Sequence, residues 1–182
     1  MSPIPPHATK VFSWILFDIY QRPQQQFDGS KKTFEMVRWF DVCKALCVVW
    51  NTILISHEVQ PHQGKKVTLP GGMMNRWEKI EEAIKREVLE EIGYTFSQQQ
   101  HFKTFDYYYS CIERHRHYFI MKWPILKEKQ HLDSGENIQI IPYTFEEFVQ
   151  WISNNDDDIS IHIKNTYIIA NRLNELSQLL FE

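Results

Sequence analysis

Residues 69–96, LPGGMMNRWEKIEEAIKREVLEEIGYTF, combine a glycine turn, a segment rich in carboxylates and a final glycine. On a helix over residues 78–92, at about 100° per residue, apolar side chains recur at every fourth position. These side chains are Ile80, Ile84, Val88 and Ile92. A single apolar row of this kind packs against a core, so the segment predicts an amphipathic helix around which the rest of the chain folds.

Three carboxylates lie beside this apolar row. Glu87 and Glu91 are one helical turn apart and Glu90 lies one step further round, so the three share an arc of about 100°. Crowded carboxylates repel one another, and a divalent cation compensates them. Oxygen ligands suit Mg²⁺ or Mn²⁺ rather than zinc, which prefers His and Cys. The pattern therefore favours a site for a hard cation over a solvated acidic helix face.

Glycines bound the predicted helix on both sides. Before it, residues 70–72 (PGG) form a turn in which backbone carbonyls can approach a ligand closely, and after it Gly93 predicts a C-terminal cap. Glu78 and Arg86 carry opposite charges, and we expect them to form an ion pair that braces the loop against the helix. Both ends of the helix are thus fixed by the sequence.

The spacing of these residues resembles the Nudix box, G-x5-E-x7-R-E-U-x-E-E-x-G-U, where U is a bulky aliphatic residue. Its positions are filled here by Gly72, Glu78, Arg86, Glu87, Val88, Glu90, Glu91, Gly93 and Tyr94. Tyr94 departs from the pattern because it is aromatic. The chain thus resembles a Nudix hydrolase over roughly residues 11–153. This resemblance implies an α/β fold, the Nudix αβα sandwich with a mixed central sheet.

The resemblance also implies a role for each residue of the box. Glu87 and Glu91 correspond to the main ligands of Mg²⁺, with Mn²⁺ as the alternative ion. Glu90 assists them, and the Gly71 carbonyl completes the site. The residues implied as structural support of the box are Gly72, Glu78, Arg86 and Gly93.

The general base is expected outside the metal ligands, although Glu90 is kept among the catalytic candidates. In the ADP-ribose branch of the family a Glu from a loop after the central strands can activate the water. Glu136, in the sequence LDSGENI, is the first counterpart. Glu113 is the second, on the expected connection between two aromatic strands.

The implied activity is metal-dependent hydrolysis of a pyrophosphate bond in a nucleoside diphosphate linked to another moiety. Residues 11–39 contain a strand, a D-G turn and the segment TFEMVR, which resemble the N-terminal extension of the ADP-ribose and nucleotide-sugar pyrophosphatases. This resemblance makes ADP-ribose or a nucleotide sugar the leading substrate. In that branch the extension pairs two subunits, so a homodimer is expected.

Two other functions remain open at this point. About 16 residues beyond the box, ADP-ribose enzymes have Pro and diadenosine polyphosphate enzymes have Tyr near that position, whereas this chain has Ser110 after Tyr109. Hydrolysis of a nucleoside triphosphate or dinucleoside polyphosphate is therefore the alternative enzyme activity. A non-catalytic nucleotide sensor is less favoured, since the box is intact and no DNA-binding module is evident.

Composition narrows the class of partner. The chain has 182 residues, 43% of them hydrophobic, which is enough for one domain with a sizeable core. Its net charge is −3. Without a basic run, binding to nucleic acid or to a membrane surface is not expected, while Arg114 and Arg116 could meet a small anionic substrate. Three cysteines and no signal-like N-terminus favour the cytoplasm.

The remaining pattern predicts one Nudix domain over residues 11–182 after a flexible lead-in over residues 1–10. The predicted strands cover residues 11–20, 32–39, 42–50, 52–59, 67–69, 102–110, 116–123 and 138–141, with loops at 21–26, 111–115 and 124–135. Thr144 and Glu147 form a capping-box pattern that opens a helix. A closing amphipathic helix is predicted over residues 161–180.

Overall fold

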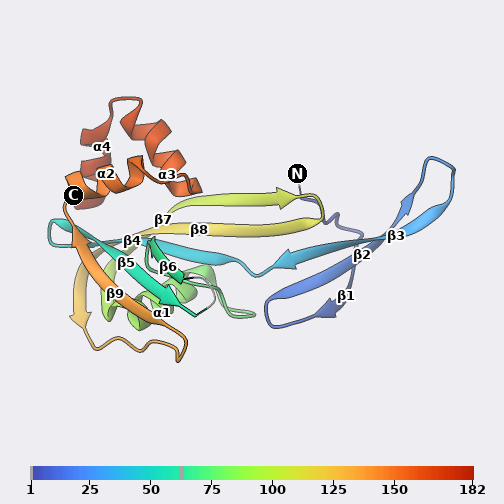
Figure 1. The fold of residues 1–182 in the computed structure, drawn as a ribbon, viewed down its shortest axis with the longest axis horizontal. Coiled ribbons are helices and arrows are strands. Elements are labelled where there is room, and N and C mark those ends of the chain that lie inside the picture. Colours follow the sequence, from blue (N-terminus) through green and yellow to red (C-terminus); the bar gives the residue numbers. More distant parts are fainter. Residues whose placement is uncertain (1, 62–63) are drawn as a thin grey trace.

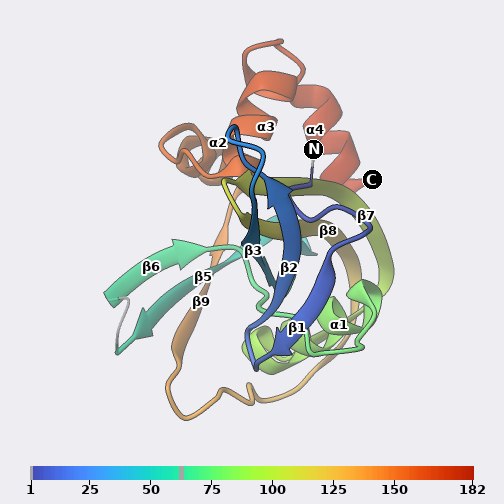
Figure 2. The ribbon, with the colours of Figure 1, turned by 90° about the vertical axis from the view of Figure 1, so that its right-hand side faces the viewer.

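The structure, a computed structural model, describes residues 2–61 and 64–182. Within them, nine strands form one mixed sheet, and helices lie on two sides of it (Figures 1 and 2). The strands are β1 Thr9–Ser13, β2 Phe17–Gln25, β3 Lys31–Trp39, β4 Val42–Val49, β5 Thr52–Gln60, β6 Gly64–Thr68, β7 Tyr94–Tyr109, β8 Ile112–Lys127 and β9 Asn137–Tyr143. The helices are α1 Ile80–Ile92, α2 Phe145–Ser153, α3 Asp158–Ile163, the π-helical turn η1 Lys164–Ile168 and α4 Leu173–Phe181.

Strand β4 shows why the core has two halves. Its apolar run alternates, so that Leu46 and Val48 pack toward α2, α3 and α4, while Ala45, Cys47 and Val49 pack toward α1. Both faces of this strand are buried, as its near-continuous apolar sequence predicts. The predicted αβα sandwich with a mixed central sheet is confirmed.

Helix α1 begins and ends close to the predicted positions. Ile84, Val88 and Ile92 are buried against the sheet, whereas Ile80 is only partly buried at the first turn. Gly93 ends the helix with a left-handed φ of 72°, and its N–H donates to the Leu89 carbonyl. A side chain is strained at such a φ, which explains the glycine at this cap.

The first three strands extend away from the rest of the molecule and are called the N-terminal arm, Thr9–Trp39 (Figure 1). The predicted hairpin with its D-G turn is present as β2 and β3, which pair antiparallel, but the bounds of its first strand and the loop predicted over residues 21–26 are wrong. The chain turns back at residues 14–16, and β2 continues to Gln25 because its backbone pairs with β3 along its whole length. A backbone ladder tolerates polar side chains that face solvent, so the glutamine run remains a strand.

The flexible lead-in predicted over residues 1–10 differs in part from the structure. Met1 lies outside the described residues. Ser2 Oγ hydrogen-bonds the Glu113 carboxylate, and the Ala8 N–H donates to the Pro5 carbonyl over 2.9 Å. Thr9 already begins β1, where it is aligned with Gln21 of β2. Pairing with β2 therefore orders the end of this segment.

Strands β7 and β8 are far longer than predicted, at 16 residues each. The predicted connection over residues 111–115 is wrong, because the turn lies at Ser110 and Cys111 and Glu113 is inside β8. β8 pairs with β7 on one edge and with both β3 and β4 on the other. Those backbone hydrogen bonds keep the polar segments extended, and β8 also takes the first residues of the predicted loop at 124–135.

The C-terminal region packs on the face opposite α1. The predicted capping box is confirmed, since Thr144 Oγ1 accepts from the Glu147 N–H while the Glu147 carboxylate accepts from the Thr144 N–H. The single helix predicted over residues 161–180 is wrong. It is divided into α3, η1 and α4, and Asn171 takes a left-handed φ of 56° at the break, a conformation that Asn tolerates better than most residues.

None of the helices in the described part of the chain has both the length and the apolar composition needed to cross a membrane.

Candidate active site

A cavity of about 700 Å³ lies where the glycine loop, α1 and the ends of several strands meet. The box contributes Gly71, Gly72, Arg86, Glu87, Glu90 and Glu91 to its lining. Strands contribute Lys44, Glu58, Lys66, Arg114, Arg116 and Tyr118, the loop before β9 contributes His131, Asp133 and Glu136, and the α2–α3 region contributes Trp151, Asp157 and Ile159. The cavity is therefore lined by acidic and basic side chains from both halves of the fold.

Arg86 organises the carboxylates of the box. Its Nε and Nη2 donate to the two oxygens of Glu78 over 2.8 and 2.9 Å, which is the predicted ion pair in bidentate form. Its Nη1 donates to Glu87 over 2.7 Å and to Glu90 over 3.0 Å. The Arg86 hydrogen bond holds the pKa of Glu78 below its usual range. One guanidinium thus fixes the glycine loop to the helix.

Glu91 is the most deeply buried carboxylate of the box. Burial raises its pKa to about 7, although the Lys44 charge and a 2.7 Å hydrogen bond from the Gly71 N–H oppose this shift. Burial also raises the pKa of Glu87, against the opposing effect of Arg86. Removing carboxylates from water is costly, so a nearby positive charge would stabilise their ionised forms.

Gly72 brings the loop backbone against the carboxylate of Glu87. A Cβ at this position would lie 2.4 Å from Glu87 Oε2, which is too close for a real contact. Cys43 and Ala45 of β4 donate to the carbonyls of Gly72 and Pro70, so the loop is held in place by the sheet. The loop and the carboxylates consequently form one compact wall of the cavity.

The donor set in this wall fits a hard divalent cation. Three carboxylates and a closely packed backbone face one cavity, and oxygen donors of this type bind Mg²⁺ or Mn²⁺. Among the described residues, no three acidic, imidazole or thiol side chains already converge as a preformed metal cluster. Oxygens of Glu87, Glu90 and Glu91 instead accept hydrogen bonds from Arg86 and from the Gly71 N–H.

The two candidates for the general base lie in different places. Glu136 lines the cavity together with the box carboxylates, in the loop that precedes β9. Glu113 does not line it: this side chain is buried beside the arm, near Arg38 and His115. The expectation that Glu113 lies on the connection between two aromatic strands is wrong, because Glu113 lies within β8.

Sequence spacing missed several cavity residues that come from strands. Lys44 and Glu58 form an ion pair of 3.8 Å, and both side chains are largely buried. Glu58 Oε1 lacks a hydrogen-bond partner in the described part of the chain. A charged residue inside each apolar strand could have indicated Lys44 and Glu58 as site residues. Only the tertiary alignment of β4 with β5 shows that both side chains face the box. Arg114 and Arg116 do line the cavity.

Comparison with known proteins agrees with this arrangement. A family model described as the NUDIX domain matches residues 44–161. The ADP-ribose pyrophosphatase of Bacillus subtilis (strain 168) is 23% identical over 150 residues, which is 81% of each chain. A crystal structure of an ADP compounds hydrolase superposes with a TM-score of 0.66 at 13% identity, covering 96% of this chain and 92% of the other.

A second solved structure supports the same fold. The MutT NUDIX hydrolase from Burkholderia pseudomallei has a TM-score of 0.50 at 16% identity, with 59% of this chain and 84% of that chain covered. The α/β sandwich and the carboxylate wall define a hydrolase of phosphorus anhydrides in class. The chain belongs to the Nudix family. Members of this family generally use divalent metal ions and act on small nucleotide substrates.

Proposed function

We propose that this enzyme hydrolyses the pyrophosphate bond of a nucleoside diphosphate linked to a second moiety, with ADP-ribose or a nucleotide sugar as substrate. The observation that carries the proposal is the convergence of Glu87, Glu90 and Glu91 with the glycine loop on one wall of a 700 Å³ cavity. A cavity of this size suits a small organic ligand.

In this proposal Glu87 and Glu91 are the main ligands of Mg²⁺, with Mn²⁺ as the alternative. Glu90 and the Gly71 carbonyl complete the site. When bound, the cation would offset charge on the phosphate oxygens and lower the pKa of the attacking water. Gly72, Glu78, Arg86 and Gly93 hold the loop and helix in register.

Glu136 is the proposed general base. It lies on the cavity, and its carboxylate accepts a long 3.3 Å hydrogen bond from the Asp133 N–H. A carboxylate in a loop that faces the cavity can reach a water close to the substrate, whereas the box glutamates are committed to the cation. Its proposed role in the reaction is to accept a proton from that water.

ADP-ribose leads the list of substrates because the B. subtilis relative is an ADP-ribose pyrophosphatase and one similar structure is an ADP compounds hydrolase. A triphosphate or dinucleoside polyphosphate would use the same carboxylates with a different base pocket. An assay with Mg²⁺ on ADP-ribose, UDP-glucose, ATP and diadenosine tetraphosphate separates these alternatives. Excess EDTA should abolish turnover, and failure to cleave any of the four compounds would contradict the proposal.

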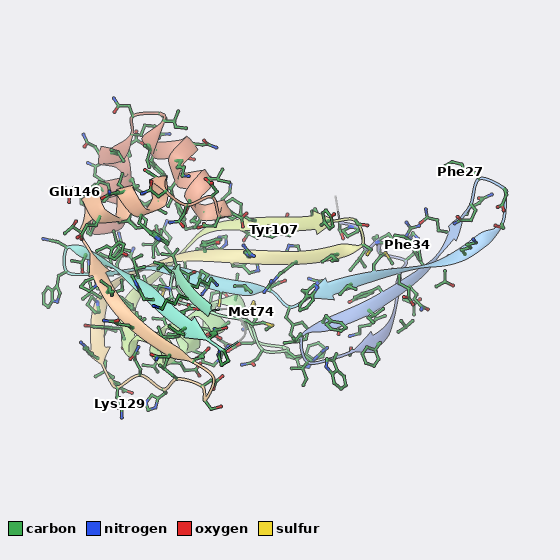
Figure 3. The ribbon with its side chains drawn as sticks, viewed as in Figure 1. Phe27, Phe34, Met74, Tyr107, Lys129 and Glu146 are labelled. Carbon is green, nitrogen blue, oxygen red and sulfur yellow. The ribbon has the colours of Figure 1, made fainter. Side chains whose placement is uncertain are left out.

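We also propose a homodimer formed through the arm. The arm carries exposed apolar side chains, namely Val11, Phe12, Trp14, Ile15, Leu16, Phe27 and Phe34. Figure 3 shows Phe27 at the far tip and Phe34 further down β3, both outside the body of the molecule. A projecting β-ribbon with this much apolar surface is marginally stable by itself, and a second copy would bury that surface.

A further inference from the structure

Four basic side chains line the cavity beside and beyond the carboxylate wall. Lys44 comes from β4, Lys66 from β6, and Arg114 and Arg116 from β8. None of them is a ligand in the cation site proposed at the box, and in the described part of the chain the ion pairs of the box carboxylates are made by Arg86. Their presence in one cavity requires a separate explanation.

These basic groups lie close enough to repel one another. Partial burial and the neighbouring Lys44 and Arg116 charges lower the pKa of Lys66, with Glu58 opposing the shift. Burial and the charge of Arg116 lower the pKa of Arg114, while Asp41 partly compensates. Groups that disfavour each other's positive charge are stabilised when an anion lies between them.

Strand register places Lys44 and Arg114 at different levels of the cavity. Lys44 is aligned with Tyr118 of β8, and its neighbours in β4 bind the glycine loop, so Lys44 lies at the level of the box. Arg114 leaves β8 four residues before Tyr118, which is about 13 Å along the strand. Lys44 thus lies beside the box, and Arg114 lies further along β8 from it.

The two arginines differ in how they are held. Arg116 lies over the Tyr107 ring, 4.6 Å from its centroid, and its Nη1 is 3.1 Å from the Tyr107 hydroxyl and 3.4 Å from Asp158 Oδ2. Arg114 is half-buried, and its buried Nε has no hydrogen-bond partner among the described residues. Figure 3 shows Tyr107 on β7 beside β8. Arg116 is prepositioned, and Arg114 retains donor capacity that a ligand could use.

We propose that Arg114 and Arg116 form a second anion subsite, which binds a carboxylate or phosphate monoester carried by the substrate in addition to its scissile diphosphate. The proposal rests on the proposed function and specifies its substrate class as nucleoside diphosphate derivatives with a further negative group. A guanidinium pair binds either anion through charge-assisted hydrogen bonds. Within that class, a substrate that carries the added anionic group is then preferred over its counterpart without it.

Two pairs of substrates test the subsite and identify the source of the anion. UDP-glucuronate and UDP-glucose differ by a carboxylate on the sugar, and 2′-phospho-ADP-ribose and ADP-ribose differ by a phosphate on the nucleoside. In at least one pair, the wild-type enzyme should have a kcat/KM about 10- to 100-fold higher for the anionic member, the range expected for charge-assisted hydrogen bonds. A ratio near one in both pairs overturns the proposal and requires no variant.

Arg114→Gln should reduce that ratio about tenfold or more, and Arg114→Lys should retain part of it. Arg172→Gln is the matched control, since Arg172 pairs with exposed Glu175 on α4 and does not line the cavity; its ratio should equal that of the wild type. An equal loss for both members of a pair in Arg114→Gln would assign Arg114 to the diphosphate and overturn the subsite.

If no compound is hydrolysed, the proposed function fails and the subsite is judged by binding instead. Calorimetric titration of the same two pairs then reports the affinity ratio directly. Tighter binding of the anionic member that Arg114→Gln removes supports the subsite without turnover. Equal affinities within both pairs overturn it.

Discussion

The Nudix box and the N-terminal arm differ in how their side chains find partners. In the box, one guanidinium satisfies three carboxylates and a backbone N–H satisfies a fourth. In the arm, the rings of Phe12 and Trp14 stack on each other at 5.9 Å, yet both remain about half exposed. The contrast indicates that local pairing organises the box, whereas the arm has apolar surface left for a second molecule.

The largest expected effect on kcat comes from a carboxylate in the cavity, Glu136, compared with one at the base of the arm, Glu113. Glu136→Gln should lower kcat by about 10²- to 10⁴-fold with little change in KM, because the loss falls on proton transfer. Glu113→Gln is the comparison, since Glu113 is buried next to Arg38 of the arm and does not line the cavity. Steady-state kinetics with Mg²⁺ measures both. Normal turnover in Glu136→Gln would exclude this residue as the base.

The second effect concerns the deepest carboxylate of the box. Glu91→Gln keeps the size of the side chain but removes the charge, so kcat should fall by about 10²-fold or more, as for the loss of one strong electrostatic stabiliser. Titration of Mg²⁺ against the purified variant should also show weaker binding. Turnover and Mg²⁺ affinity like those of the wild type would show that this carboxylate holds no cation.

A third measurement tests the arm directly. Light scattering at micromolar concentration should give twice the 21.9 kDa chain mass for the wild type. The double variant Phe12→Ser/Trp14→Ser should shift toward the monomer mass, because it removes apolar surface that a dimer would bury. Trp50→Ser is the matched control, since Trp50 is 86% exposed at the β4–β5 turn, away from the arm. A monomeric wild type refutes the dimer.

The smallest effect concerns the brace of the box. Glu78→Gln removes the charge-assisted pair with Arg86 and should cost about 1.5–3 kcal/mol of stability, on the order of 5 °C in Tm. The pKa of Glu78 is lowered in the folded state. Its contribution to the free energy of unfolding is therefore present above the ordinary carboxylate pKa and is lost as the pH falls through the lowered value. Thermal melts should therefore converge for the two proteins at acid pH. A constant difference would point to lost packing instead.

Local patterns predicted the parts of the fold that depend on neighbouring residues. The apolar row of α1, the glycine at its end and the capping box of α2 each involve contacts within about one helical turn. The turn at residues 14–16 of the arm was not predicted, because this segment, Trp14-Ile15-Leu16, is apolar and has no Gly or Pro to indicate a turn. The helix break near Asn171 likewise depends on one residue's φ rather than on periodicity.

Residues of the candidate site were likewise predicted where they are neighbours in sequence and missed where strand pairing brings them together. Glu87, Glu90 and Glu91 face one cavity because they are close neighbours on one helix. Lys44, Glu58 and Lys66 reach that cavity through pairing among β4, β5 and β6, which no local spacing encodes. The sequence placed Glu136 ahead of Glu113 as the base, but it could not show that β8 begins at Ile112 and holds Glu113 outside the cavity.

Strand β8 pairs with strands of both regions. It pairs with β3 of the arm at Ile112 and Glu113, and with β4 of the body from Arg116 onward. Arg114 lies in the short span between these two attachments. The segment of β8 that connects the arm to the body is therefore also the segment that carries Arg114 into the cavity, and β7 pairs with it at Tyr107.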